Sequence, residues 1–257
     1  MKELKRYLDS RIGEFSFYFE DLRSGYTYTF KEHKVMQAGE SIILPISIVF
    51  MKEIELNKLN LQEKVKIGEE DRVESAYGIL DVLGHDEYSL KDLLIASVVQ
   101  RDITAANKLI EIIGLDRINE GIKEFGLKDT KIVNKISSNV QEVENLISTR
   151  DIAQCFRILS KNEYLNKDNS EFLINLSKKC QIRSKIPYYL PKSEWNNIAN
   201  SPGRLDLIEN DSALICIEKG EFIFSIMSRN LPNNVYGATI ISRLSKMMWD
   251  IVQSNWK

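Results

Sequence analysis

Two β-hairpin patterns lie near opposite ends of this 257-residue chain, and their placement limits the fold more than any other feature. Residues 14–30 hold two alternating segments separated by Arg-Ser-Gly, and residues 212–230 hold two apolar segments separated by Glu-Lys-Gly. Between these hairpins, apolar residues recur at helical spacing. The clearest helical segments there are 40–56, 89–100, 104–113, 116–125, 148–160 and 169–179, and further helices are expected over 2–12 and 233–253.

This order of elements predicts an α+β fold. Hairpins join antiparallel strands, so we expect a five-stranded antiparallel sheet flanked by the two terminal helices. Strands at both ends with helices between them indicate a discontinuous α/β lobe, formed by residues 1–38 and 194–257, into which an all-helical lobe at 39–193 is inserted. Ser89 and Ser148 stand where helix N-caps are expected.

The composition argues against several classes of function. The formal net charge of −2 gives no excess charge for binding nucleic acid or an anionic membrane. No run approaches the ~18 apolar residues that a membrane span requires. The charged N-terminal segment MKELKRYLDSRIGEF lacks the apolar centre of a signal peptide. We therefore expect a cytoplasmic protein, and an exported protein whose signal has been removed is the alternative.

No cofactor and no metal site are expected. The two histidines and three cysteines are scattered and show no zinc-ligand spacing. Each cysteine lies in an apolar or helical context, which predicts buried free thiols. These cysteines are Cys155, Cys180 and Cys216.

Three stretches of the sequence carry a resemblance to a known family. They are AGESIILPISIVFMKEIE (38–55), SLKDLLIASVVQRDITAANKLIEIIG (89–114) and NSPGRLDLIENDSALI (200–215). Together with the order of helices and hairpins, they resemble the class A β-lactamase and penicillin-recognising serine hydrolase family over nearly the whole chain. The resemblance implies the β-lactamase/transpeptidase-like fold and a cleft built from three motifs, Ser-x-x-Lys, Ser-Asp-Asn and Lys-Thr-Gly.

The first of these motifs lacks its nucleophile and its base. Pro45 fixes the register and places Glu40 at the family's serine and Ile43 at its lysine. In the family's reaction a serine hydroxyl attacks the lactam or peptide carbonyl, while an amine, or a carboxylate acting through water, takes its proton. Glu40 has no hydroxyl to acylate, and Ile43 cannot act as a base.

The second and third motifs are changed as well. Residues 101–103 (Arg-Asp-Ile) replace Ser-Asp-Asn, and residues 201–203 (Ser-Pro-Gly) replace Lys-Thr-Gly. Ile103 cannot hydrogen-bond a substrate amide, and Ser201 supplies no cation for a substrate carboxylate. Losing one such group typically costs several orders of magnitude in rate, so we expect no catalytic residue. The resemblance marks six positions, called here the vestigial cleft: Glu40, Ile43, Arg101, Ile103, Ser201 and Gly203.

The sequence therefore predicts a catalytically inactive, β-lactamase-like protein that binds or scaffolds an unidentified protein or small molecule, in an oligomeric state that the sequence does not indicate. Two alternatives stay open. One is a β-lactamase or D-Ala-D-Ala peptidase of the serine-hydrolase type that uses an unrecognised nucleophile. The other is a non-hydrolytic binder of β-lactams or peptidoglycan fragments. A shifted register does not restore the first motif, because the chain's one Ser-x-x-Lys is its last four residues, 254–257.

The changed positions are also expected to fit one another. Family geometry places the first-motif serine opposite the second-motif serine, and the first-motif lysine near the second-motif asparagine. Carried onto this chain, this geometry predicts an ion pair between Glu40 and Arg101 and an apolar contact between Ile43 and Ile103. Both would close or narrow the vestigial cleft.

Overall fold

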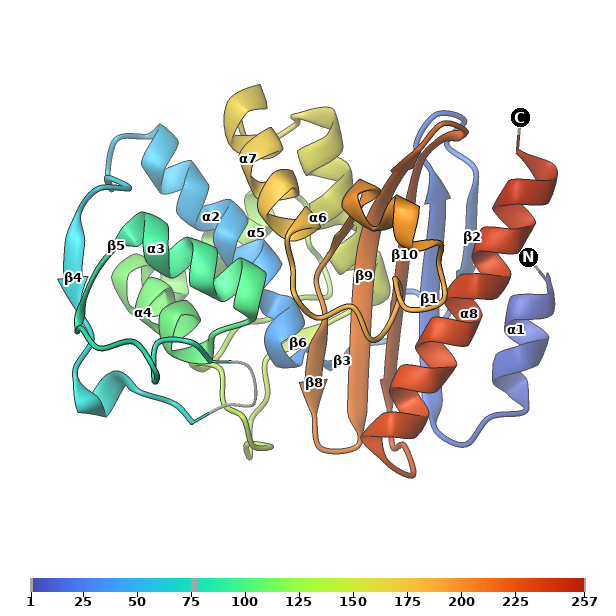
Figure 1. Ribbon diagram of the computed structural model, residues 1–257, viewed down its shortest axis with the longest axis horizontal. Coiled ribbons are helices and arrows are strands. Elements are labelled where there is room, and N and C mark those ends of the chain that lie inside the picture. Colours follow the sequence, from blue (N-terminus) through green and yellow to red (C-terminus); the bar gives the residue numbers. More distant parts are fainter. Residues whose placement is uncertain (1, 75–77, 257) are drawn as a thin grey trace.

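The computed structural model describes residues 2–74 and 78–256. An antiparallel sheet of six strands crosses the molecule, with the order β2–β1–β10–β9–β7 and with β8 also paired to β9 (Figure 1). The expected antiparallel arrangement is confirmed. The strands are β1 (Glu14–Asp21), β2 (Thr27–Phe30), β7 (Ile198–Asn200), β8 (Gly203–Leu205), β9 (Ile208–Ile217) and β10 (Gly220–Arg229).

The sheet has the five expected positions, but its edge position is divided between two strands. β7 pairs with the second half of β9, and β8 pairs with the start of β9. Pro202 lies between β7 and β8, and proline has no N–H to donate to the ladder. The edge strand is interrupted at the third motif of the vestigial cleft.

The two hairpins at the ends of the chain form one sheet, because β1 pairs along its whole length with β10. Alternate side chains point to opposite faces of these strands. Phe17 and Phe224 face the terminal helices, and Ile223 and Met227 face the other helices. Since both faces are covered, the strands are apolar on both sides.

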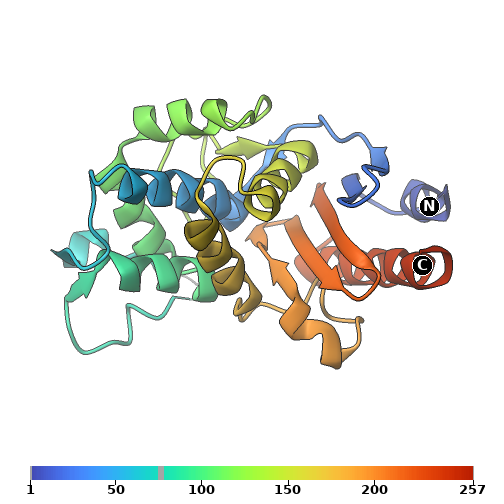
Figure 2. The ribbon, with the colours of Figure 1, turned by 90° about the horizontal axis from the view of Figure 1, so that it is seen from above.

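The terminal helices α1 (Lys2–Asp9) and α8 (Asn234–Asn255) lie side by side against one face of the sheet (Figures 1 and 2). Leu4 and Leu8 of α1 and Ile241 and Leu244 of α8 are buried in the core that these helices form with the sheet. None of the helices in the described part of the chain is long and apolar enough to span a membrane.

The other helices cover the opposite face, and every helix expected from the sequence is present. Ser89 and Ser148 are N-caps, as predicted, and accept hydrogen bonds from Asp92 N at 3.1 Å and Asp151 N at 3.2 Å. These helices are α2 (Ile43–Glu55), α3 (Leu90–Ile95), α4 (Ile103–Ile113), α5 (Leu115–Glu124), α6 (Thr149–Lys161) and α7 (Lys167–Lys178), with the 3₁₀ turns η1 (Gly39–Ile42) and η2 (Glu69–Asp71) and the π-helix η3 (Ala96–Gln100). The 3₁₀ turn η4 (Lys192–Asn197) lies at the sheet edge instead, where its Trp195 packs against the core under α1 and α8.

Residues 39–193 are not purely helical, however. The described part of this range (39–74 and 78–193) also contains three short strands, which were not expected because strands of two or three residues show no alternation. β4 pairs with β5, and β6 pairs with a further short strand, β3, from before η1. Their bounds are β3 (Met36–Gln37), β4 (Lys64–Lys66), β5 (Glu87–Ser89) and β6 (Leu146–Ile147).

Helix α2 lies at the centre of the helical region and contacts α4, α5, α6 and α7. Nearly all of its side chains are buried, which explains the long apolar run in its sequence. The vestigial cleft lies where the start of α2 meets the β8 edge of the sheet. The cysteines are free thiols; Cys155 and Cys180 are buried as expected, whereas Cys216 is partly exposed.

Candidate functional site

Glu40 lies in η1, immediately before α2, and is 6% exposed. Its carboxylate Oε2 accepts a hydrogen bond of 2.6 Å from the backbone N–H of Arg204 in β8. Gly39 has a φ of +53°, and a Cβ on Gly203 would lie 2.4 Å from the backbone nitrogen of Ser41. Both positions therefore need glycine. The turn before α2 is packed directly against the third-motif strand.

Arg101 joins η3 to α4 in a left-handed conformation, with a φ of +60°, and its side chain is completely buried. Nη2 donates a hydrogen bond to the main-chain carbonyl of Glu40. Across residues 2–74 and 78–256, the guanidinium forms no ion pair with the Glu40 carboxylate, and Nε has no hydrogen-bond partner. The predicted ion pair is therefore wrong. The Glu40 carboxylate instead accepts a hydrogen bond from the backbone N–H of Arg204, a buried donor that needs an acceptor.

Ile43 and Ile103 lie in the first turns of α2 and α4, two helices that pack against each other. Each is 1% exposed, and both belong to the same hydrophobic core. A base or an amide at either position would be buried among hydrocarbon groups and would need a partner there. These two positions therefore serve packing.

Asp102, the second-motif residue that matches the family, and Asn107 on the same helix each hold a loop to α4. Asp102 is the N-cap of α4 and accepts from Ala105 N at 2.8 Å, and its other oxygen accepts from Ile79 N at 2.7 Å and Leu80 N at 2.9 Å. Asn107 similarly exchanges two hydrogen bonds with the backbone of residue 136. These side chains have structural roles.

Ser201 is 1% exposed and connects the third motif to the first. Its backbone N–H donates to Ser212 O at 2.8 Å, and its hydroxyl donates to Ser41 O at 3.4 Å. The hydroxyl is thus directed at the backbone before α2.

These contacts leave almost no space at the vestigial cleft. The remaining cavity has a volume of about 10 Å³. One water molecule needs about 10–15 Å³, whereas ligand pockets have about 300–1,000 Å³. The cavity is lined by Glu40, Arg101, Ile182, Lys185, Pro202, Gly203 and Arg204. The structure therefore brings the first, second and third motifs together around a closed space.

Lys185 is a buried cation of this site that the sequence reasoning missed. Its Nζ donates to Gly203 O at 2.7 Å and Asn210 O at 2.9 Å, and it lies 2.5 Å from the carboxylate of Glu209. It comes from an irregular segment outside the three motifs. The alternation Ile-Arg-Ser-Lys-Ile over 182–186 was the available signal, because it places two cations on one side of an extended segment.

The buried charges around the vestigial cleft are of both signs. Asp211 accepts hydrogen bonds from Ile186 N at 3.0 Å and Ser212 N at 3.0 Å. Burial raises the pKa of Asp211 to about 6, although Lys185 opposes this rise. Burial also raises the pKa of the Cys180 thiol, against the effect of Arg101.

Among the side chains that the structure describes, no three His, Cys, Asp or Glu residues converge as a metal site requires.

Comparison with known proteins identifies the family. The model of the beta-lactamase enzyme family matches residues 1–252. A β-lactamase from Sphaerobacter thermophilus superposes with a TM-score of 0.91 at 21% identity, over 98% of this chain and 97% of that one. The protein PBP-A superposes with a TM-score of 0.90 at 21% identity, over 98% and 95%.

A β-lactamase from Chitinophaga pinensis gives a TM-score of 0.88 at 16% identity, over 98% of each chain. Similarity at such low identity shows the fold, which is the expected β-lactamase-like fold. The match of the family model over nearly the whole chain goes further. The chain belongs to the beta-lactamase enzyme family.

Proposed function

We propose that this chain is a catalytically inactive member of its family that acts by binding or scaffolding. The observation that carries this proposal is the closed vestigial cleft, whose cavity of about 10 Å³ leaves no room for a lactam or a peptide. Glu40 stands at the nucleophile position, and its carboxylate is held by the backbone of β8.

The groups that remain at the cleft are committed to structural contacts. Ile43 offers no base, and its side chain is in the core. Lys185 supplies a cation near the third motif, but it is 4% exposed and bonded to two carbonyls and a carboxylate. A substrate carboxylate would have to displace these partners, which favours a role without acylation.

The alternative of an unrecognised nucleophile has little support from the neighbouring side chains. Ser41 and Ser47 donate their hydroxyl hydrogens to Ala38 O and Ile43 O, at 2.5 and 2.7 Å, and both are buried. Cys180 is buried, and its raised pKa disfavours the reactive thiolate. In the terminal Ser-x-x-Lys, Ser254 donates to Asp250 O at 2.7 Å, and Lys257 lies outside the described residues.

Nitrocefin turnover tests the proposal. We expect neither the native chain nor the Glu40→Ser variant to hydrolyse nitrocefin, because a serine at position 40 would still lack a base at position 43 and an open cleft. The β-lactamase of Sphaerobacter thermophilus is the positive control. Turnover that a single substitution in the vestigial cleft abolishes would contradict the proposal, and turnover gained by Glu40→Ser would identify an unrecognised base.

The remaining alternative, a non-hydrolytic binder of β-lactams or peptidoglycan fragments in the old cleft, requires that cleft to open. Calorimetric titration with muropeptides distinguishes it. We expect no heat of binding that responds to substitution of Arg101, the buried side chain that lines the cavity. Binding that is strengthened or lost in Arg101→Ala would favour the ligand-binding alternative.

A further inference from the structure

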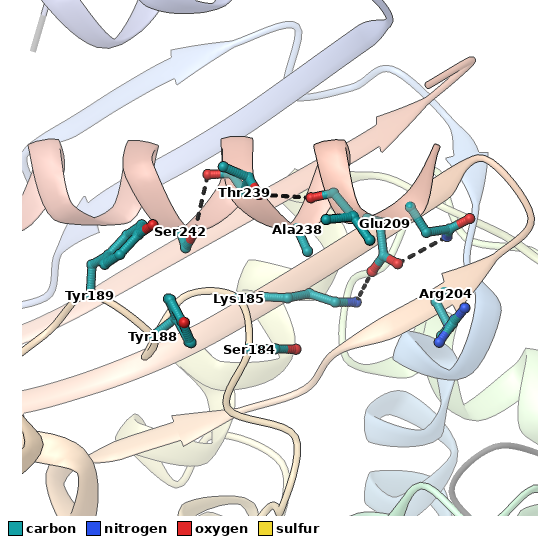
Figure 3. Close-up of a pocket in the computed structure, with 11 residues that line it drawn as sticks. Ser184, Lys185, Tyr188, Tyr189, Arg204, Glu209, Ala238, Thr239 and Ser242 are labelled. Atoms are coloured by element: carbon teal, nitrogen blue, oxygen red, sulfur yellow. Dashed lines mark hydrogen bonds and ion pairs between the residues drawn. The ribbon is translucent and has the colours of Figure 1, made fainter. Parts of the chain in front are cut away.

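A second hollow lies beside the vestigial cleft and is much larger. It has a volume of about 410 Å³ and lies between the first half of α8, the segment 184–189 and the edge of the sheet (Figure 3). Among the residues that the structure describes, its lining includes none of the six positions of the vestigial cleft. A volume of this size suits a small organic ligand.

The charged residues that line this pocket carry one net positive charge. Lys185 and Glu209 form an ion pair, with Nζ 2.5 Å from Oε2, and both side chains are about 95% buried. Glu209 Oε1 also accepts a hydrogen bond from Asn234 Nδ2 at 2.9 Å (Figure 3). Arg204 is the third charged residue of the lining, and it is partly exposed, so a ligand can reach it. Because the charges of the buried pair offset each other, the lining favours an anion.

The guanidinium of Arg204 suits a carboxylate in particular. It has five N–H donors in a planar fork that matches the two oxygens of a carboxylate, so it can donate to a ligand and to a protein group at once. The pocket also lies beside the first turn of α8, in which no residue is acidic. The partial positive charge of that helix end therefore adds to the charge of Arg204.

Two adjacent tyrosines lie at the end of the pocket away from Arg204 (Figure 3). Tyr188 is 55% exposed and Tyr189 is 43% exposed. Their rings are 4.9 Å apart between centroids and inclined at 70°. Exposed tyrosine rings offer a flat apolar surface to a ligand. The pocket is thus cationic at one end and aromatic at the other.

The segment that carries the tyrosines is fixed to the core. The N–H of Ile186 donates to Asp211 Oδ2 at 3.0 Å, and its carbonyl accepts from the hydroxyl of Ser245 in α8 at 2.9 Å. The N–H of Tyr188 donates to Lys185 O at 3.0 Å. Since the backbone is already ordered, little entropy is lost when a ligand packs on the rings.

We propose that this pocket binds an elongated organic monoanion, a carboxylate joined to an aromatic ring. The carboxylate lies at Arg204, and the ring packs on Tyr188 and Tyr189. An ammonium group in place of the carboxylate meets the charge of Arg204, and a ligand without a ring leaves the tyrosines uncovered. The proposal goes beyond catalytic inactivity, because it concerns a surface that the nitrocefin assay does not test.

The test is an NMR titration of the ¹⁵N-labelled full chain with 4-phenylbutyrate, 4-phenyl-1-butanol and 4-phenylbutylamine, which share one body and differ in charge. Butyrate, which has no ring, is the fourth probe. We expect 4-phenylbutyrate to shift the amide signals of Tyr188, Tyr189 and residues 235–242, with a dissociation constant on the order of 1 mM. It should bind about fivefold more tightly than each of the other three.

The titration can overturn the proposal in several ways. Equal affinity of the three phenylbutyl probes, or tightest binding of the amine, would show that the pocket does not select an anion. Equal affinity of butyrate and 4-phenylbutyrate would show that the tyrosines do not bind the ring. Absence of shifts with 4-phenylbutyrate, or shifts confined to other residues, would show that this pocket is not the site.

One pair of variants tests the cationic end. Arg204→Gln should weaken 4-phenylbutyrate about fivefold and leave 4-phenyl-1-butanol unchanged, a difference that a general change of structure would not produce. Arg23→Gln is the matched control, because Arg23 is exposed in the β1–β2 turn, and it should leave both affinities unchanged. Unchanged affinity for 4-phenylbutyrate in Arg204→Gln would contradict the proposal.

A second pair tests the aromatic end. Tyr189→Ala should weaken 4-phenylbutyrate about fivefold and leave butyrate unchanged. Tyr26→Ala is the matched control, because Tyr26 is 44% exposed but lies in the β1–β2 turn. Equal losses of affinity in these two variants would argue against the tyrosine end. The comparison of probes on the native chain keeps the test valid if a variant fails to fold.

Discussion

At the scale of single residues, Asp211 is the buried acid whose ionisation bears most directly on stability. It is 1% exposed, and it receives hydrogen bonds from two backbone N–H groups and from Asn200. Burial is the largest effect on its pKa and outweighs these bonds and the charge of Lys185, so the pKa rises from 3.8 to about 6. The folded chain therefore holds this proton more tightly than the unfolded chain does.

This difference predicts a particular dependence of stability on pH. Because the folded-state pKa is the higher one, the stabilisation due to protonated Asp211 is fully present below about pH 4 and is lost as the pH rises through about 6. The free energy of unfolding of the native chain, relative to Asp211→Asn, should fall by on the order of 3 kcal/mol across this range. Urea denaturation of both proteins from pH 4 to pH 8 measures it. A difference that is independent of pH, or that increases with pH, would contradict this assignment.

The resemblance marked the positions of the vestigial cleft but did not indicate the hydrogen-bond partners of their side chains. The spacing from Pro45 placed Glu40 before α2, and the structure brings it to the same cavity as Arg101 and Gly203. A residue pattern carries no information on which atom of Glu40 meets the guanidinium. That choice depends on the N–H of Arg204, which lies 164 positions away in the chain.

At the scale of elements, the start of α4 connects the helix to a distant loop. Asp102 combines an ordinary N-cap bond to Ala105 N with two bonds to the backbone of Ile79 and Leu80. Thr104 adds a bond of 2.8 Å from Val73 N. A buried carboxylate that accepts from three N–H groups leaves all three unsatisfied when it is removed.

Asp102→Ala should therefore destabilise the chain by about 3–5 kcal/mol, well beyond the ~1 kcal/mol of an exposed N-cap. Asn166→Ala is the matched control, because Asn166 caps α7 through one bond of 2.9 Å to Asn169 N at an exposed position. Equilibrium urea denaturation measures both variants. Equal losses in the two would mean that the bonds to residues 79 and 80 contribute nothing.

The elements that the sequence predicted are those with a repeated physical signal. The helices have apolar residues at helical spacing, and Ser89 and Ser148 mark two of their starts. β4 and β5 have no such signal, since each depends on a partner distant in sequence. The helix predicted over 89–100 is present, but its last turn, η3, is a π-helix, a form that apolar spacing does not indicate. The division of the sheet edge into β7 and β8 was indicated in the sequence only by Pro202, which lies between the two strands.

At the scale of the whole molecule, two hydrophobic cores lie on the two faces of one sheet. Phe224 and Ile226 of β10 belong to the core under α1 and α8, and Ile223 and Met227 of the same strand belong to the other core. If the sheet separates from the helices on one face and unfolds, the hydrophobic side chains on its other face are exposed as well. This shared sheet predicts that the chain unfolds as one cooperative unit despite its two-part architecture.

The three tryptophans make this prediction testable, because all of them contact the core under α1 and α8: Trp195, Trp249 and Trp256. Their fluorescence reports on that side, whereas far-ultraviolet circular dichroism reports mainly on the helices across the sheet. The two urea transitions should have the same midpoint and slope. Separate midpoints would show that the two sides unfold independently.

The proposed inactivity depends on a vestigial cleft that is closed and cannot be acylated. Intact-protein mass spectrometry after incubation with excess penicillin G tests it most directly, because it detects a covalent adduct even when turnover is absent. A PBP-A mutant, for which an acyl-enzyme complex with penicillin-G has been solved, is the positive control. We predict an unchanged mass for this chain under conditions that acylate that mutant. A mass increase of one penicillin that survives denaturation and maps to a side chain of the cleft would contradict it.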